Sequence, residues 1–358
     1  MDYITNGLKP RVPLVKPGEA VPFARADAGD RAVVPLTWAA TSAQHPYANL
    51  GDALSPLVVS ALSGLPIAYH RFQSNTERLA CVGTIGHKFV GGRVHVWGTG
   101  FDPRRHPLER RVGYCLPPQT EFWVHAVRGP LTADLLRQQG LTVPAVYGDP
   151  VWFLPTLLPP APKTYELGVV LHLSELRQRM PESTYKREFK RYRVPPHLAE
   201  SVQIISPLTE PNVGAIAQRI QAITACKRIV STSLHGLIIA EAYGIPCAYF
   251  SAYGNGGQMV DLTHDDPKLL QMVDRRMRDA YLGFGKQTLW VYGRDRTARS
   301  PWRHIIRELD RHWQPLDWSG ADFLDAFPLP LAFNPLKPHP DSLNLLEHPI
   351  QAMRRIWL

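Results

Sequence analysis

The segment at residues 228–250 constrains the fold of this chain more than any other. Residues 228–230, R-I-V, form a short β-branched run that is typical of a buried strand. The apolar segment 237–243 is long enough for about two helical turns, and Gly244 marks its end. Residues 246–250, P-C-A-Y-F, predict the next strand. A strand, a helix and a strand in succession build a parallel sheet, so we expect a fold of the α/β class.

The loop between the first strand and the helix, S-T-S-L-H-G at 231–236, places polar groups where open α/β sheets bind ligands. Unpaired N–H groups at the start of a helix favour an anion, often a phosphate. Ser231 and Ser233 add hydroxyl groups, and His235 adds an imidazole. A purely structural role fits the spacing equally well, because His235 would then cap the helix and the serines would satisfy backbone groups.

The length and charge of the chain limit its class. With 358 residues, two domains are expected. The formal net charge of +9 favours anionic partners, such as a phosphorylated donor, a diphosphate-linked acceptor or an acidic membrane face. A simple contribution to solubility is the other interpretation. The sequence has no helix-turn-helix spacing, zinc knuckle or aromatic RNA-binding pattern, so nucleic acid is not an expected partner.

Cysteine use and hydropathy favour a cytoplasmic location. The four cysteines are scattered without metal-binding spacing, which suits a reducing compartment and predicts no metal site. No window of about 18 or more apolar residues is present to span a membrane. The N-terminus lacks the basic and apolar regions of a secretory signal. Residues 353–358, M-R-R-I-W-L, allow for peripheral contact with the inner face of the membrane.

Changes in composition predict the domain boundaries. Residues 1–35 are rich in proline and are expected to form an extended lead-in to an N-terminal domain that ends at residue 157. The segment 158–166 is the predicted linker. A second α/β domain, at 167–300, carries the polar loop. The Trp- and Pro-rich tail at 301–358 is expected to pack back on the first domain or to reach the membrane.

Six short blocks occur in one order along the chain. They are N-L-G-D at 49–52, V-W-G-T-G at 96–100, V-R-G-P at 127–130, G-D-P at 148–150, S-T-S-L-H-G at 231–236 and R-D-A-Y at 278–281. One such block carries little information, but six in order are hard to obtain by chance. Together they resemble the polysaccharide pyruvyl transferase family. The serine-rich form of the loop is similar to that of the exopolysaccharide ketal pyruvyl transferase branch.

The resemblance implies both a reaction and an architecture. Members of the family transfer a pyruvyl group from phosphoenolpyruvate to sugar hydroxyls. The acceptor sugar would belong to a polysaccharide or to its lipid- or nucleotide-diphosphate-linked precursor, and the product would be a pyruvate ketal. Phosphoenolpyruvate is then a co-substrate, and no cofactor is expected. The implied fold is two Rossmann-like domains that face a cleft, in a GT-B-like arrangement.

Two residues are expected to carry the catalysis. The resemblance makes Arg128 a donor-binding residue, and its guanidinium fits a carboxylate or a phosphate; pairing with a local acid such as Asp134 is the alternative. His235 is the expected general acid/base, because the charge of histidine changes near neutral pH. The expected donor-binding set is Arg128, Ser231, Ser233, Leu234, His235, Gly236 and Arg278.

The expected acceptor-binding residues lie at polar, glycine-containing strand ends. They are Asn49, Gly51, Asp52, Gly98, Gly100, Asp149 and His172. Structural alternatives exist, because Asn and Asp commonly cap helices or form turns. For His172, at the end of a buried strand, binding and structural roles are equally open.

Basic residues leave two further questions. The commoner family form of the loop is S-x-R-L-H-G, so Ser233 leaves the donor short of one cation. Either Arg128 and the N–H groups of the helix then contribute more to binding, or a further base, Arg275, Arg278 or Lys286, helps. The basic loop at 104–111 is interpreted as a solvated surface, and contact with an anionic acceptor is the alternative.

Two other classes of function stay open at this point. A GT-B glycosyltransferase with a nucleotide-sugar donor would use His235 and Arg128 on the diphosphate. A non-catalytic protein of glycan assembly would keep the fold without the reaction. Preference for one donor over the other distinguishes the first class, and the effect of His235→Ala on function distinguishes the second.

Overall fold

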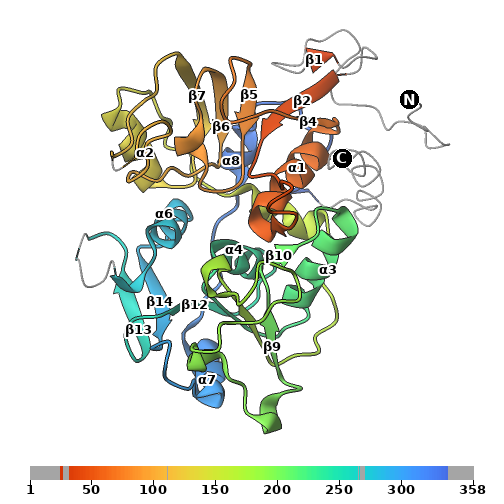
Figure 1. Cartoon of the computed structure of the whole chain (residues 1–358), viewed down its shortest axis with the longest axis vertical. Helices are drawn as coiled ribbons and strands as arrows, with labels where there is room; N and C mark the ends of the chain where they lie inside the picture. The colour runs from red at the N-terminus through yellow and green to blue at the C-terminus, as the bar shows by residue number, and fades with distance from the viewer. Residues whose placement is uncertain (1–24, 27–31, 111, 265, 267–270, 338–358) are drawn as a thin grey trace, which may run out of the picture.

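The computed structural model describes residues 25–26, 32–110, 112–264, 266 and 271–337. In this part of the chain two six-stranded sheets form the framework, one in the upper half and one in the lower half of Figure 1. The sheets are mainly parallel, so the mixed α/β fold predicted from the 228–250 segment is confirmed.

The first sheet has parallel strands in the spatial order β4, β2, β5, β6 and β7. Their bounds are β2 Ala32–Thr37, β4 Ile67–Tyr69, β5 Arg78–Ala80, β6 Gly92–Trp97 and β7 Thr120–Ala126, with β1, Arg25–Ala26, antiparallel to β2. Among these parallel strands, β2 comes first in the chain. β4 then pairs with one side of β2, and β5, β6 and β7 follow in order on the other side.

The second sheet repeats this order. Its parallel strands lie in the order β9, β8, β11, β12 and β14, with β13 antiparallel at the edge. The bounds are β8 Leu167–Val170, β9 Val202–Ile205, β11 Ile229–Ser231, β12 Cys247–Ser251, β13 Gly256–Asp261 and β14 Thr288–Gly293. The two switch points lie between β2 and β5 and between β8 and β11. Ligands bind beyond the carboxyl ends of strands at such points.

Three helices and a 3-10 helix form a shared layer of the core. They are α1 (Leu50–Ser63), α3 (Val213–Thr224), α4 (Leu234–Ala242) and η2 (Pro150–Thr156), and they contact one another. Figure 1 shows α4 between the two sheets. Because α4 is apolar on nearly every face, it is buried along most of its length. One hydrophobic core therefore includes residues of both halves of the chain.

The two halves are joined on one side by a short antiparallel pair of strands. β3 (Ala48–Asn49) pairs with β10 (Leu208–Thr209), and the backbone N–H of Leu50 donates to the carbonyl of Pro207 at 2.8 Å. This pairing holds the first turn of α1 beside the second sheet.

On the other side, helix α6 (Arg275–Gly283) docks on the start of α2 (Pro130–Gln138). The carboxylate of Asp279 accepts hydrogen bonds from the Arg128 guanidinium at 3.1 and 3.2 Å and from the backbone N–H of Thr132 at 3.1 Å. Two glycines permit this contact: a Cβ on Gly129 would lie 1.8 Å from the Asp279 carbonyl oxygen, and one on Gly283 would lie 2.2 Å from that of Arg128.

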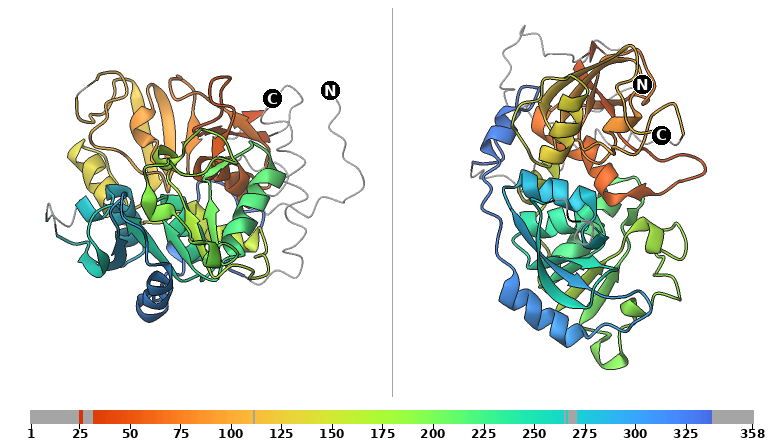
Figure 2. Two further views of the ribbon diagram at one scale, coloured as in Figure 1. Left: turned by 60° about the horizontal axis from the view of Figure 1, so that its bottom comes forward. Right: turned by 90° about the vertical axis from the view of Figure 1, so that its left-hand side faces the viewer.

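The chain returns to the first sheet near its end. Helix α7 (Trp302–His312) packs on the second sheet, and the following segment reaches α8 (Ala321–Asp325). The indole N–H of Trp97 in β6 donates to the Phe323 carbonyl at 2.8 Å, and the rings of these two residues stack with centroids 4.6 Å apart. The right-hand view of Figure 2 shows this connection running along the edge of the molecule.

Several of the expected boundaries are not tested. The limits at 157, 166 and 300 stay predictions. Most of the lead-in at 1–35 and the residues 353–358, for which membrane contact was considered, lie outside the described residues. Within the described residues, none of the helices has the length and apolar character needed to cross a membrane.

Asp279→Asn is expected to lower the free energy of unfolding by about 3–5 kcal/mol, because it leaves the buried Arg128 guanidinium without its counter-charge. Urea denaturation measures this change. The matched control is Asp134→Asn, which breaks the exposed Arg137–Asp134 pair and should cost no more than about 1 kcal/mol. Equal losses in the two variants would contradict a structural role for the buried pair.

Candidate active site

The two switch points open onto one pocket. It has a volume of about 150 Å³ and lies where the loops that follow β2, β5, β8 and β11 meet the first turns of α1 and α6. We call it the central pocket, and its lining residues are Ala39, Asn49, Asp52, Gly83, Thr84, Ile85, Lys88, His172, Ser233, Leu234, His235 and Arg276. The shared strand order therefore brings loops from both sheets to a single place.

His235 lies in the first turn of α4, two residues after the N-cap residue Ser233, with only 7% of its surface exposed. Its ring packs against Gly51 in the first turn of α1, where a Cβ would lie 1.8 Å from the imidazole Nδ1. On the other side, the Nε2 atom lies 3.7 Å from Oδ2 of Asp149. Neither atom has a hydrogen-bond partner among the described residues. The imidazole is thus held between a helix start and a buried carboxyl group.

Burial controls the charges around this histidine. Burial, with smaller contributions from Arg128 and Arg276, lowers the pKa of His235 to about 3. Burial raises the pKa of Asp149 to about 6. It also raises the pKa of Asp52 to about 6, although the charges of Lys88 and Arg276 partly offset this shift. The expectation of a near-neutral pKa for His235 is therefore wrong for this structure. The imidazolium would lose its hydration on burial and would be repelled by Arg128 and Arg276.

Arg128 lies behind the central pocket. Its guanidinium is 2% exposed, binds Asp279 through Nε and Nη2, and donates from Nη1 to the Thr84 hydroxyl at 2.5 Å. Gly100 packs on the guanidinium, since a Cβ there would lie 2.3 Å from Cζ. The suggested pairing with Asp134 is wrong, because Asp134 binds Arg137 instead. Arg128 reaches the pocket through Thr84, which lines it.

Two other cations line the central pocket. Lys88 ends the 3-10 helix η1 (Gly86–Lys88), and Arg276 lies in the first turn of α6. Asp274 accepts two hydrogen bonds from the Arg276 guanidinium, at 2.9 and 3.0 Å. Arg276 was missed from the sequence. It lies three positions before Asp279, on the same face of the helix, and this i, i+3 spacing was the available signal.

The cations that the sequence suggested have other contacts. Arg275 donates to the Leu131 carbonyl at 3.1 Å, and Arg278 is buried and donates to the Leu262 carbonyl at 2.6 Å. Arg275, Arg278 and Lys286 are not among the described residues that line the central pocket.

Comparison with known proteins points to one family. The model of the polysaccharide pyruvyl transferase family matches residues 82–252, just under half of the chain, and supports membership of this family. The chain is an enzyme that transfers pyruvyl groups to polysaccharide. No curated protein and no solved structure matches the chain.

The matched region of the transferase contains most of the central pocket, but Ala39, Asn49, Asp52 and Arg276 lie outside it. Structural proximity therefore adds these four residues to a site that the family model covers only in part. Loops as far apart in sequence as those of Asn49 and Arg276 meet at His235.

Apart from Arg278, the predicted site residues of the transferase fall into two groups. Those that line the central pocket are Asn49, Asp52, His172, Ser233, Leu234 and His235. The others support it from behind: Gly51 packs on His235, Gly100 on Arg128, Gly236 on the Ser231 hydroxyl, and Gly98 against Pro150 with a φ of +84°. The Ser231 hydroxyl donates to the Ser233 carbonyl at 2.8 Å, so it shapes the loop.

His172 and Asp149 also have structural partners. The His172 imidazole caps the 3-10 helix η3 (Leu173–Glu175) by accepting from the backbone N–H of Ser174 at 3.3 Å. Asp149 caps η2 by accepting from the N–H of Val151 at 3.0 Å. Among the described residues, no group of three or more His, Cys, Asp or Glu side chains is placed to hold a metal.

Gly51→Ala is expected to abolish most of the activity, by about 100-fold or more if His235 is the acid/base, because the new Cβ occupies the position of the imidazole. The measurement is kcat under saturating donor. Gly214→Ala is the matched control, since Gly214 is also the second residue of its helix and its Cβ would meet Asn212 Oδ1 at an ordinary 3.5 Å. A fully active Gly51→Ala variant would show that the close packing is not required.

The raised pKa of Asp149 predicts a pH dependence of stability. A folded-state pKa of about 6 exceeds the unfolded value of about 3.9, so the contribution of this group is most favourable below pH ~4 and is lost as the pH rises through 6. Asp149→Asn removes this dependence. Between pH 4 and 7 the native protein should lose about 2–3 kcal/mol more of its unfolding free energy than the variant does. Parallel curves from urea denaturation would contradict the shift.

Proposed function

We propose that the transferase moves the pyruvyl group of phosphoenolpyruvate onto hydroxyls of a sugar, in a polysaccharide or in its lipid- or nucleotide-diphosphate-linked precursor, and forms a pyruvate ketal. The convergence of His235, Lys88 and Arg276 with two helix starts on the central pocket is the observation that carries this proposal. Phosphoenolpyruvate has a carboxylate and a phosphate, and both need cations and N–H donors.

The helix starts support binding of an anion. α1 and α4 both begin at the central pocket, with Asn49 and Ser233 as their N-cap residues. In the described structure, neither side chain caps the N–H groups of its own helix. Those N–H groups, together with the positive end of each helix dipole, are suited to hold the phosphate and the carboxylate of the donor.

Lys88 and Arg276 supply the positive charge that Ser233 lacks. Both line the central pocket, and Arg276 is held in place by Asp274. We assign the direct contacts with the donor to these two cations. Arg128, whose guanidinium already binds Asp279 and Thr84, then acts as a positioning residue through the Thr84 hydroxyl. Direct binding of the donor by Arg128 stays a prediction.

The reaction needs a proton at the methylene carbon of phosphoenolpyruvate. His235 delivers it, and the adjacent carbon becomes an oxocarbenium-like centre that a sugar hydroxyl attacks. The C–O bond to phosphate breaks, and a second hydroxyl closes the ketal. The proton of one hydroxyl replaces the proton used at the methylene carbon, and that of the other leaves with the phosphate.

The neighbours of His235 suit this role. The negative charges of a bound donor raise the pKa of the imidazole from its low value, so binding of the donor and protonation of His235 are linked. Asp149 Oδ2, 3.7 Å from Nε2, stabilises the imidazolium that results. Asp52, with its raised pKa, lines the same pocket and is placed to accept a proton from the sugar hydroxyl.

The architecture and location complete the proposal. Each sheet with its helices would be a Rossmann-like domain, in a GT-B-like arrangement, and the repeated strand order supports this description. We place the transferase in the cytoplasm, where phosphoenolpyruvate is produced, with peripheral contact at the inner face of the membrane where a lipid-linked acceptor would lie.

The proposal predicts turnover with phosphoenolpyruvate and a pool of sugar acceptors, measured as released phosphate and as the mass of the acceptor. His235→Ala should lower kcat by about 100-fold or more. Arg276→Ala should raise the KM for phosphoenolpyruvate by about tenfold or more, since it removes a charge-assisted hydrogen bond. Arg275→Ala is the matched control, because the neighbouring arginine binds a backbone carbonyl outside the pocket.

Three outcomes would overturn parts of this proposal. Equal effects of Arg275→Ala and Arg276→Ala would contradict the assignment of the donor cation. An unchanged kcat in His235→Ala would remove the acid/base. Transfer from a nucleotide sugar, with no response to phosphoenolpyruvate, would restore the glycosyltransferase interpretation, which the family match does not favour.

A further inference from the structure

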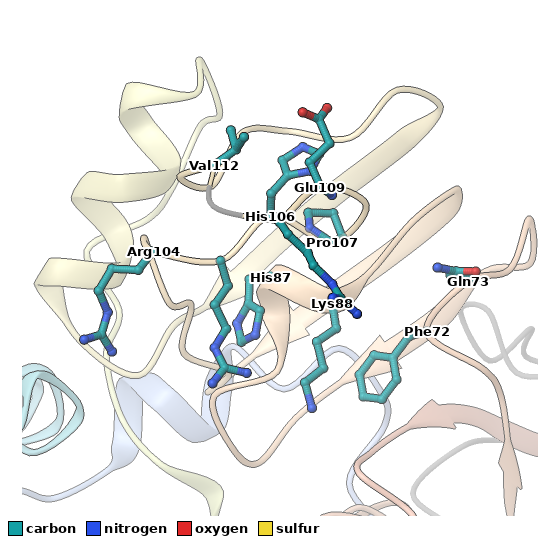
Figure 3. Close-up of a pocket in the computed structure, with 11 residues that line it drawn as sticks. Phe72, Gln73, His87, Lys88, Arg104, His106, Pro107, Glu109 and Val112 are labelled. Carbon is teal, nitrogen blue, oxygen red and sulfur yellow. The ribbon is translucent and has the colours of Figure 1, made fainter.

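A second and larger cavity lies beside the central pocket. It has a volume of about 510 Å³ and is shown in Figure 3. We call it the basic cavity, and its lining residues are Phe72, Gln73, His87, Lys88, Arg104, Arg105, His106, Pro107, Glu109, Arg110 and Val112. The loop that forms its rim is ordered by His106, whose Nδ1 accepts from the backbone N–H groups of Leu108 and Glu109 at 3.3 and 3.0 Å.

The basic cavity has more positive than negative charge. Four cations line it, Lys88, Arg104, Arg105 and Arg110. Glu109 is the carboxylate among the described lining residues, and Asp102 pairs with Arg104 and Arg105 at 3.1 and 3.5 Å. The surplus of two charges within one concave surface favours a compact dianion.

A neutral hydrogen-bond donor lies in the wall of the same cavity. His87 is 5% exposed, and its Nδ1 accepts from the backbone N–H of Asp102 at 3.3 Å. The proton of the neutral ring is therefore on Nε2, and that atom has no partner among the described residues. Burial, with the nearby charge of Lys88, lowers the pKa of His87 to about 4, which keeps the ring neutral at physiological pH.

The basic cavity and the central pocket are adjacent. Lys88 lines both of them. Arg104 lines the basic cavity, and it lies close enough to Arg276 of the central pocket and to Asp274 for their charges to affect its pKa. The Lys88 ammonium lies over the ring of Phe72, 5.1 Å from the ring centroid, so a cation and an apolar ring lie together in the wall of the basic cavity. A molecule that spans the two sites would place its anionic part beside the arginines and its sugar toward His235.

We propose that the basic cavity binds the diphosphate of a diphosphate-linked sugar acceptor. This inference rests on the proposed function, because it names the class of acceptor for the same reaction. A diphosphate diester carries two negative charges on adjacent groups, which matches the surplus of two cations, whereas a single sugar carboxylate would leave one cation unpaired. The diphosphate is common to nucleotide-linked and lipid-linked sugars, and the cavity recognises the part that they share.

The test uses calorimetric titration of the whole chain with three probes: UDP-glucose, farnesyl-diphosphate-linked glucose and free glucose. Both diphosphates, or one of them, should bind, and inorganic pyrophosphate should compete with them. Arg105→Ala and Arg110→Ala should each raise the Kd by about tenfold, since each removes a charge-assisted contact. Arg187→Ala, an exposed arginine on the second half of the chain, is the control and should leave the Kd unchanged.

The two variant arginines lie outside the lining of the central pocket, so donor binding gives an independent readout. Stabilisation by phosphoenolpyruvate on a melting curve should be the same in the native protein, Arg105→Ala and Arg110→Ala. If phosphoenolpyruvate has no effect while the diphosphates bind as expected, the donor proposal fails and the basic cavity stands.

Three results would overturn the inference. They are a native protein that ignores pyrophosphate and both linked sugars, a Kd that Arg105→Ala and Arg110→Ala leave unchanged, and free glucose or an uncharged glucan that binds as tightly as the diphosphates. Tighter binding of the farnesyl compound identifies a lipid-linked acceptor, and tighter binding of UDP-glucose identifies a nucleotide-linked one. Either result supports a diphosphate site.

Discussion

The buried ion pair between Arg128 and Asp279 positions much of the active site. Arg128 follows the last strand of the first sheet, and Asp279 lies in α6 beside the second sheet. Their contact sets the angle and depth at which α6 meets α2, and it thereby places Arg276, one helical turn earlier, at the central pocket. A buried pair of this kind adds little net stability but strongly disfavours other arrangements, because any shift would leave a charge buried without its partner.

The same pair explains the distribution of charge around His235. Since Asp279 balances Arg128, the cations among the described residues that line the central pocket are Lys88 and Arg276, and Lys88 also lines the basic cavity. Buried acids, Asp52 and Asp149, lie near the imidazole, and burial raises the pKa of each. The site therefore combines cations that can bind an anion with buried groups that can exchange a proton.

Local features of the fold were predictable from the sequence. The segment at 228–250 forms β11, α4 and β12 as expected, because Gly244 adopts a φ of +63° that ends the helix and the mainly apolar runs on either side fill buried strands. The polar loops after the strands were expected at the site, since parallel strands place their carboxyl ends at one edge of a sheet.

Long-range partners were not predictable in this way. Arg128 finds its acid 151 positions away, whereas the sequence suggested a residue six positions away that binds Arg137 instead. Arg276 was overlooked because its spacing from Asp279 points to the site only once Asp279 is known to bind Arg128 in the other half of the chain. The low pKa of His235 depends on burial between α1 and α4, and that burial arises only when the two halves pack together.

The hydrogen bond from Trp97 to Phe323 has a consequence for the synthesis of this protein. The two residues are 226 positions apart, and a ribosome that adds about 5–20 residues per second needs roughly 10–45 s to make the intervening chain. Throughout that time the Trp97 ring lacks its contacts with Phe323 and Phe327, although for most of it the strands of the first sheet and Phe153 have already emerged. The nascent protein thus passes through a period in which an apolar surface around Trp97 is open to chaperones or to aggregation, and only the last part of translation closes it.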